Sequence, residues 1–181
     1  MEEIHIELDE GRVLRSLRAD DLDALYAVAK ANAEHLRPWH AWAYDVQRDA
    51  TETFVTSTIA AFDRGEALSG LIVEGDEIVG ACGFNRIVAQ NEFAEIGYWL
   101  AASHEGRGIM SAAVRALIAH GFGPLGLHRI EIGAAPHNAR SRAIPERLGF
   151  TEEGTLREVE RFPDRYGDIV VYALLAQDWS G

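Results

Sequence analysis

Two segments that open helices, with about one β-strand between them, constrain the fold of this chain more than any other feature. The first covers residues 104–111 and places two glycines before an apolar run. The second begins at Asn138 and continues to the sequence Leu-Gly-Phe at 148–150. The strand before the first of these helices and the strand after it are predicted to run parallel in one sheet, because the helix between them is a crossover connection.

The glycine segment has the properties of an anion-binding loop. Gly106 and Gly108 lack a Cβ atom, which lets backbone N–H groups turn inward just before residues 109–118. A helix N-terminus adds unpaired donors and the positive end of the helix dipole, so the loop would hold a pyrophosphate such as that of coenzyme A. Arg107 would add a charge-assisted contact to the same phosphates. Taken alone, two glycines before a helix more often form only a tight turn.

Two common nucleotide-binding patterns do not fit this loop. The P-loop needs Gly-x-x-x-x-Gly-Lys-Ser/Thr, and no lysine stands at the required position. Nor does the segment read Gly-x-Gly-x-x-Gly after a strand with an acid downstream, which disfavours dinucleotides and hydride transfer.

Length, composition and charge limit the classes of protein to which this chain can belong. The 181 residues are 48% hydrophobic and 25% charged, so we expect a single domain over residues 1–181 with a sizeable core. No apolar run has the length of a membrane span, and residues 1–10 do not read as a signal peptide, which predicts a cytoplasmic protein without membrane partners. The formal charge of −12 disfavours DNA and would suit cationic acceptors, although solubility alone accounts for it.

Cysteine and histidine indicate neither a thiol nucleophile nor a metal site. Cys82 is the single cysteine, and its setting at 79–84 is typical of a buried strand. The seven histidines lack the spacing of a zinc site, so no metal is expected.

Hydrophobic periodicity and turn residues predict an α/β fold with a mixed sheet. A hairpin within 4–17 turns at Glu10 and Gly11, a first helix begins near Leu22, and Pro38 is placed to start a second short helix. Further strands are expected at 69–73, 77–85, 93–101, 129–134, 151–159 and 166–176, and further helices at 50–63, 111–122 and 138–148.

Four stretches then occur in a fixed order: Glu-Ile-Gly-Tyr-Trp-Leu at 95–100, Gly-Arg-Gly-Ile-Met at 106–110, Asn-Ala-Arg-Ser-Arg-Ala at 138–143 and Glu-Arg-Leu-Gly-Phe at 146–150. Together they resemble the acyl-CoA core of the GNAT N-acetyltransferases, and most closely the RimJ/RimL-like branch, which acetylates the N-terminal amines of ribosomal proteins. The resemblance covers most of the chain from Leu14 onward. It implies a GNAT-like, mostly antiparallel central sheet with a splayed parallel pair and helices on both faces.

The resemblance also implies acetyl-CoA as the acetyl donor, with its pantetheine arm lying between the splayed strands. The expected cofactor-binding residues are Tyr98, Trp99, Leu100, Gly106, Arg107, Gly108, Ile109, Met110, Ser111, Asn138 and Arg140. The chain departs from the superfamily at Glu105 and Met110, where Gln or Arg and Gly or Ala are common. It departs again at Pro145, where many members have a tyrosine general acid.

Pro145 affects the backbone hydrogen bonding of Ser141. A proline inside a helix leaves the carbonyl four residues earlier without its helical partner, which predicts that Ser141 lies in an irregular turn. In the resembling branch this serine lies near the thioester sulfur, where its hydroxyl would donate to the departing thiolate or orient the acyl group. The alternative is that Asn138 is an N-cap and Ser141 only a first-turn residue.

Two glutamates are candidates for the base that deprotonates the attacking amine. Glu95 lies on the strand that leads to the cleft, and Glu160 lies at the end of the penultimate strand. Either is equally interpreted as a surface charge paired with Arg161 or Arg129. Backbone N–H groups near Trp99 and Leu100 would stabilise the oxyanion.

The acceptor side is expected at residues 36–42, where the spacing of Trp39 and Trp42 predicts two rings on one helical face. Such rings usually build core, but the resemblance places this helix over the acceptor end of the cleft. The loop at 162–168 would close the other wall or serve only as a hairpin connection.

These observations predict an acetyl-CoA-dependent N-acetyltransferase in which the amine attacks the thioester directly, since no activated Cys or Ser-His pair is visible. A protein N-terminus is the expected acceptor. The alternatives are a small-molecule amine, such as a polyamine or an antibiotic, and a noncatalytic acyl-CoA-binding module. Exposed final strands would suit a homodimer.

Overall fold

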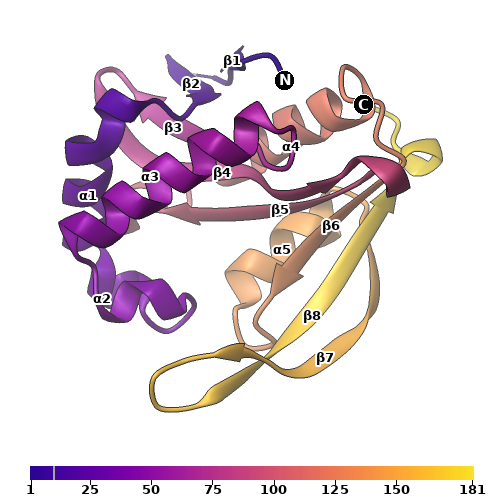
Figure 1. The fold of residues 1–181 in the computed structure, drawn as a ribbon. Helices are drawn as coiled ribbons and strands as arrows, with labels where there is room; N and C mark the ends of the chain where they lie inside the picture. Colours follow the sequence, from indigo (N-terminus) through magenta and orange to yellow (C-terminus); the bar gives the residue numbers. More distant parts are fainter. Residues whose placement is uncertain (10) are drawn as a thin grey trace.

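The computed structural model describes residues 1–9 and 11–181, so Glu10 of the expected N-terminal turn lies outside the described residues. Within the described chain, eight strands form one sheet in the order β1-β2-β3-β4-β5-β6-β8-β7 (Figure 1). The strands are β1 (His5–Glu7), β2 (Arg12–Ser16), β3 (Gly70–Glu74), β4 (Glu77–Val88), β5 (Phe93–Leu100), β6 (Arg129–Ala134), β7 (Thr151–Arg161) and β8 (Tyr166–Leu175). All neighbouring pairs are antiparallel except β5 with β6.

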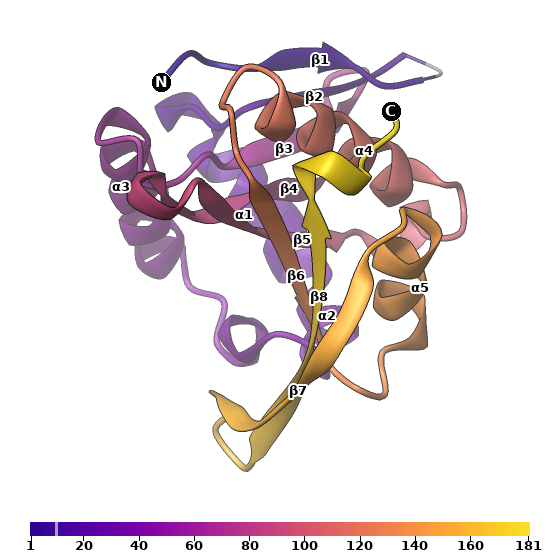
Figure 2. The same cartoon turned by 90° about the vertical axis from the view of Figure 1, so that its right-hand side faces the viewer.

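Helices cover both faces of this sheet, as the resemblance implied (Figure 2). The α-helices are α1 (Leu22–Ala31), α2 (Ala33–Leu36), α3 (Arg48–Asp63), α4 (Ile109–Phe122) and α5 (Ala139–Arg147). One core cluster joins the apolar sides of α4 and α5 to the sheet, and a second cluster joins α1 and α3 to its other face. The two faces therefore have separate cores, because alternate side chains of each strand point in opposite directions.

The parallel pair opens towards its C-terminal end. The ladder between β5 and β6 runs from the pair Phe93 and Arg129 to the pair Ile96 and Ile132. Strand β5 continues to Leu100 and remains paired with β4 on its other side. Figure 1 shows the two strands diverging beyond the paired part. Residues 97–100 therefore present an edge without β6 pairing, as expected for the splayed strands.

The prediction that a short helix starts at Pro38 is wrong. Helix α2 ends at Leu36, whose carbonyl accepts from the amides of Trp39 and His40, and the next helical turn is a 3₁₀ helix, η2 (Ala41–Tyr44). His40 is extended, with φ −132° and ψ 118°, and this residue breaks the helical path. The remaining 3₁₀ turns are η1 (Ala19–Asp21), η3 (Ala89–Asn91), η4 (Ala102–His104) and η5 (Ala176–Asp178).

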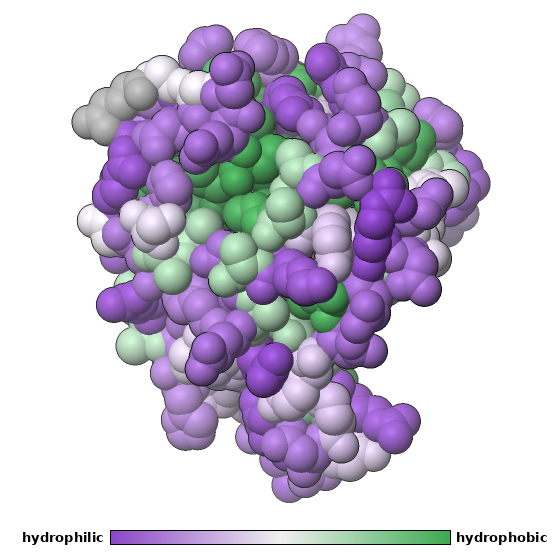
Figure 3. All heavy atoms as spheres, turned by 90° about the vertical axis from the view of Figure 1, so that its left-hand side faces the viewer, coloured by the Kyte–Doolittle hydropathy of each residue, from purple (hydrophilic) through white to green (hydrophobic). Residues whose placement is uncertain are grey.

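The surface over the N-terminal helices is mostly hydrophilic, with hydrophobic atoms gathered in a recess between polar rims (Figure 3). Among the described residues, no helix has the length and apolar character needed to cross a membrane. Cys82 is buried on β4, as its sequence setting predicted.

Candidate active site

The open edge of β5 sends two neighbouring aromatic side chains to opposite faces of the sheet. Tyr98 stands opposite Cys82 on β4 and packs against the core cluster that includes α4 and α5. Trp99 stands opposite Ala81 and packs against the cluster that includes α1 and α3. The opening between β5 and β6 thus has a different side chain on each face, both close to where pairing stops.

The glycine loop has the geometry that the sequence predicted. Gly106 and Gly108 have φ values of 76° and 77°, in the left-handed region that favours glycine, and α4 begins directly after them. Ala112 is the first α4 residue whose amide has a backbone acceptor, the carbonyl of Gly108 at 3.0 Å. Among the described residues, the amides at 106–111 have no acceptor, which fits an anion such as a pyrophosphate.

Ile109 and Met110 take part in this loop through their backbone. Their side chains are buried in the core under α4, at 0% and 7% exposure. The substitution of Met110 for the small residue common in the superfamily therefore adds core volume and leaves the loop open.

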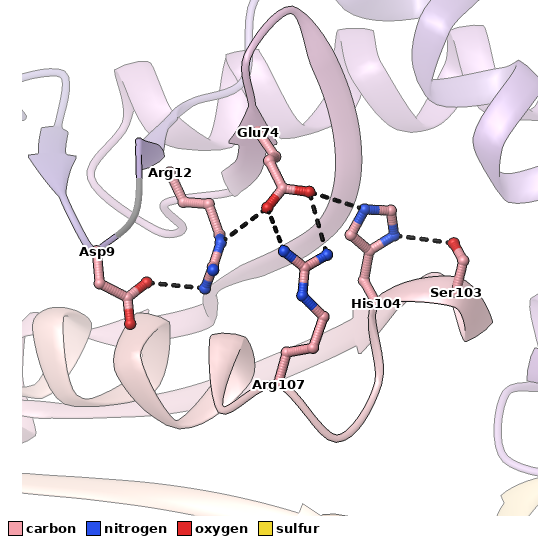
Figure 4. Close-up of polar contacts among 6 residues, drawn as sticks. All are labelled: Asp9, Arg12, Glu74, Ser103, His104 and Arg107. Carbon is pink, nitrogen blue, oxygen red and sulfur yellow. Dashed lines mark hydrogen bonds and ion pairs between the residues drawn. The ribbon is translucent and has the colours of Figure 1, made fainter.

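Arg107 is paired with a carboxylate outside its own loop. Its guanidinium donates to both carboxylate oxygens of Glu74 at the end of β3, at 2.6 and 3.3 Å (Figure 4). Glu74 also accepts from Arg12 at 3.0 Å and lies 3.0 Å from Nε2 of His104. These partners, Arg107 first, lower the pKa of Glu74. In this arrangement Arg107 ties the glycine loop to β3, and it would have to leave Glu74 to meet a phosphate.

A different arginine, Arg147 at the end of α5, reaches the first turn of α4. Its guanidinium donates to the Ser111 hydroxyl at 2.9 Å, which brings a cation from the last turn of α5 to the first turn of α4. Sequence reasoning missed it, although it belongs to the stretch 146–150 that carried the resemblance, because only the packing of α5 against the sheet brings it there. Arg140, which sequence reasoning did select, forms an ion pair with Glu105, and Glu105 lies 3.2 Å from His35 of α2.

Ser141 lies in the first turn of α5, so the expected irregular turn is wrong. The side chain of Asn138 accepts from the Ser141 amide at 3.1 Å, as an N-cap does. Helix α5 continues through Pro145 to Arg147. The Ser141 carbonyl that Pro145 deprives of its helical donor instead accepts from the Tyr98 hydroxyl at 3.1 Å. A tertiary hydrogen bond therefore replaces the missing helical one.

The two candidate bases have different surroundings. Glu95 lies in the paired part of β5, with 42% of its side chain exposed and Arg86 at 3.9 Å. Glu160 is half-buried near the end of β7, and among the described residues its carboxylate has no hydrogen bond or ion pair. Arg129 pairs with Glu131 and Glu153, and within the described chain neither candidate base forms an ion pair with Arg129 or Arg161.

The acceptor side is built from a contact between η2 and the open strand. The rings of Trp42 and Trp99 lie 5.9 Å apart, and those of Trp42 and His40 lie 5.6 Å apart. Trp39 lies in the turn before His40, so the prediction that Trp39 and Trp42 share one helical face is wrong, because extended His40 separates them.

The loop at 162–168 lies against this segment. Arg165 donates to the Tyr44 hydroxyl at 2.7 Å and to the Pro38 carbonyl at 3.1 Å, and the rings of Tyr44 and Phe162 lie 6.1 Å apart. His40 was missed by sequence reasoning. Burial, with a smaller effect of His35, lowers its pKa to about 4, so its imidazole is neutral at pH 7. No group of three or more metal-ligating side chains occurs in the part of the chain described.

A sheet that opens between its two parallel strands, beside a glycine-opened helix, defines the class of acyl-CoA N-acyltransferases with the GNAT fold. A family model described as an acetyltransferase (GNAT) domain matches residues 12–151, so the chain belongs to the GNAT acetyltransferase family. The expected enzyme class, an acetyl-CoA-dependent N-acetyltransferase, is confirmed.

Comparison with known relatives shows which branch of this family the chain resembles. The chain is 34% identical to the putative ribosomal N-acetyltransferase YdaF of Bacillus subtilis, over 96% of each chain. It is 35% identical to the ribosomal-protein-serine acetyltransferase of Escherichia coli, over 93% of this chain and 94% of the relative. Among solved structures it is similar to RimL, a ribosomal L7/L12 α-N-protein acetyltransferase in complex with coenzyme A, with a TM-score of 0.90, 31% identity and coverage of 95% and 98%. The RimJ/RimL-like resemblance is confirmed.

Proposed function

We propose that this chain is a single N-acetyltransferase domain over residues 1–181 that acts in the cytoplasm. It transfers the acetyl group of acetyl-CoA to the N-terminal α-amine of a ribosomal protein. The observation that carries the proposal is the open edge of β5 at 97–100, where Tyr98 and Trp99 face opposite sides of the sheet. On one side Tyr98 contacts Ser141, and on the other Trp99 contacts Trp42.

The donor side offers groups that suit a pyrophosphate and an extended amide chain. The amides at 106–111 and the guanidinium of Arg147 would hold the phosphates, and the Ser111 hydroxyl accepts from that guanidinium. Residues 97–100 have backbone groups left without β6 partners, which would pair with the amides of a pantetheine arm. Arg140 would join the phosphate site on leaving Glu105.

The reaction forms a bond from the amine nitrogen to the acetyl carbon and breaks the bond from that carbon to sulfur. The nitrogen must lose a proton, and the thiolate that leaves must be stabilised or protonated. Glu160 is the preferred base because it is half-buried and has no cationic partner, whereas Glu95 lies near Arg86. The Ser141 hydroxyl would donate to the thiolate. An α-amine, with a pKa of about 7.7–8.0, is the easier acceptor to deprotonate than a lysine at about 10.4.

The acceptor assignment is supported by the relatives, two of which are named for ribosomal substrates. Trp42, Trp99 and neutral His40 provide an aromatic wall on the acceptor side, and the loop at 162–168 is bound to the same segment through Tyr44. Such a wall would take the first side chains of a peptide while its amine reaches the thioester.

The test is thiol release from acetyl-CoA with a panel of ribosomal N-terminal peptides, a polyamine and an aminoglycoside, with mass spectrometry to locate the acetyl group. We expect turnover on a peptide α-amine, and kcat losses of about 100-fold for Ser141→Ala and for Glu160→Gln, but not for Glu95→Gln. Turnover only on the small amines would replace the acceptor assignment. Coenzyme A binding without thiol release on any amine would indicate the noncatalytic binding module.

A further inference from the structure

We propose that Tyr98 is a positioning residue that fixes the Ser141 hydroxyl in the cleft, and that Pro145 exposes the acceptor which holds Tyr98 there. This inference rests on the proposed acetyl transfer, in which Ser141 donates to the departing thiolate. It starts from one phenol oxygen, which lies 3.1 Å from the carbonyl oxygen and 3.1 Å from the Oγ atom of Ser141.

Pro145 makes the Ser141 carbonyl available. In an uninterrupted helix this carbonyl would accept from the amide of residue 145, and proline has no amide hydrogen. Helix α5 nevertheless continues to Arg147, so the carbonyl stays in place with its helical donor missing. A part-buried carbonyl without a donor is unfavourable, and the Tyr98 hydroxyl supplies that donor from the neighbouring strand.

The geometry also assigns the protons. A carbonyl only accepts, so the single phenol proton of Tyr98 belongs to the Ser141 carbonyl. The Ser141 hydroxyl then donates to the phenol oxygen, and its rotation about the Cβ–Oγ bond turns the same proton towards sulfur as the thiolate leaves. Tyr98 loses no proton in this scheme. Burial raises the pKa of its phenol, which keeps it in the donor form.

Tyr98 has little freedom to move. Its strand position is opposite Cys82, which is fully buried, and its ring packs against the core cluster under α4. A fixed phenol bound to two atoms of one residue restricts the rotamer of that residue, which is the condition for a preorganised donor. Helix α5 has a second phenol contact that serves as a matched control, because Tyr172 accepts from Arg142 at 2.7 Å and donates to Glu146 at 3.0 Å without touching Ser141.

The kinetic test is a double-mutant cycle on kcat. We expect Tyr98→Phe to lower kcat about tenfold with the KM for acetyl-CoA and the calorimetric affinity for coenzyme A unchanged. In the Ser141→Ala background the same change should have no further effect, because the group that Tyr98 positions is gone. Tyr172→Phe should show no such coupling to Ser141→Ala. Equal losses for Tyr98→Phe in both backgrounds, or a loss confined to KM, would overturn the proposal.

A second cycle needs no turnover. Pro145→Ala restores an amide for the Ser141 carbonyl, so Tyr98→Phe should lower the urea midpoint of unfolding less in that background than in the native chain. An identical loss in both backgrounds would show that the phenol does not depend on the carbonyl exposed by Pro145, and would overturn the inference. A native enzyme that releases no thiol with any amine would reject the proposed function and the kinetic role of Tyr98, while this cycle still decides the contact.

Discussion

At the scale of single residues, the partners of each charged group decide which groups are available to a ligand. Glu74 at the end of β3 forms ion pairs with Arg12, His104 and Arg107 (Figure 4). Glu105 forms ion pairs with His35 and Arg140. Both arginines that sequence reasoning assigned to phosphates are therefore paired with carboxylates. Arg147 instead donates to the neutral Ser111 hydroxyl, and among the described residues it has no carboxylate partner that a phosphate would have to displace.

His40 gives a prediction at the same scale. Its folded pKa is about 4, lowered by burial, whereas the unfolded imidazole has its ordinary value of 6.5. Between these two pH values the unfolded chain binds a proton at this imidazole that the folded chain does not bind. The contribution of His40 to the free energy of unfolding is therefore fully present above pH 6.5 and is lost as the pH falls towards 4. We expect this group alone to lower the free energy of unfolding by about 2 kcal/mol between pH 7.5 and 5.0.

Chemical unfolding of the native chain and of His40→Gln at both pH values measures this contribution. The variant should lose less stability on acidification than the native chain. His137→Gln, at an exposed position, should not differ from the native chain in this respect. An equal acid loss in native and His40→Gln protein would show that His40 is not the group responsible.

At the scale of elements, the two helices beside the opening differ in the residues that start them and in their backbone hydrogen bonds. Helix α4 starts from glycines with positive φ, which aim its first amides out of the helix. Helix α5 starts from the Asn138 cap and continues through Pro145 with the help of Tyr98. One helix therefore leaves backbone donors for an anion, and the other presents a serine whose carbonyl and hydroxyl contact the same phenol.

Gly108 and Gly65 form a matched pair for testing the α4 loop. Their φ values are +77° and +75°, and a Cβ atom at either position would meet nothing within 4 Å. Alanine at each should lower stability by about 1–2 kcal/mol, because both adopt the left-handed conformation. Only Gly108→Ala should raise the KM for acetyl-CoA, by about tenfold, because it disturbs amides that bind charged oxygens. A similar KM for both variants would argue against phosphate binding by this loop.

At the scale of the whole molecule, the sheet behaves as two parts joined by four residue pairs of β5 and β6. Strands β6, β8 and β7 leave the first part together, and the β7–β8 hairpin extends away from the rest of the molecule (Figures 1 and 2). Strand β7 is the outermost strand, and Leu156, Val159 and Tyr166 of this hairpin are large apolar side chains that are more than half exposed.

We propose that this hairpin pairs two copies of the chain into a homodimer, since an unpaired edge with exposed apolar side chains favours association. Light scattering after gel filtration should give a dimer mass for the native chain and a monomer mass for the double variant Leu156→Glu, Val159→Glu. Phe54→Glu, at an exposed apolar position on α3, should leave the mass unchanged. A monomer mass for the native chain, or a monomer mass for Phe54→Glu as well, would count against the hairpin as the interface.

The sequence was sufficient to predict most helices and strands because their signals are local. The strand at 129–134 matches β6 at both ends, and the glycine loop was correctly placed before α4. The error at Pro38 has a local cause of another kind, since proline suits the turn after a helix as well as the first turn of one, and only the extended backbone of His40 decides between them.

The candidate site was predicted as a set of residues, and their contacts were not. The sequence placed Ser141, Tyr98 and the glycines near one cleft only through the family resemblance. It also showed that Pro145 leaves the Ser141 carbonyl without a helical donor, but the donor that replaces it lies 43 residues earlier in the chain. The positions of Arg107 and Arg147 differ from expectation for the same reason, because ion pairs form between segments that are adjacent only after folding.

The amino-acid sequence by itself determined the alternation of strands and helices, the glycine loop before α4 and the family, because periodicity, glycine and cap residues act over a few neighbouring positions. Only the tertiary structure decided that β5 and β6 part after Ile96, that Tyr98 meets Ser141 and that Arg107 is held by Glu74. The physical reason is that each of these depends on distances between segments far apart in the chain, which packing and electrostatics set only when the whole sheet has formed.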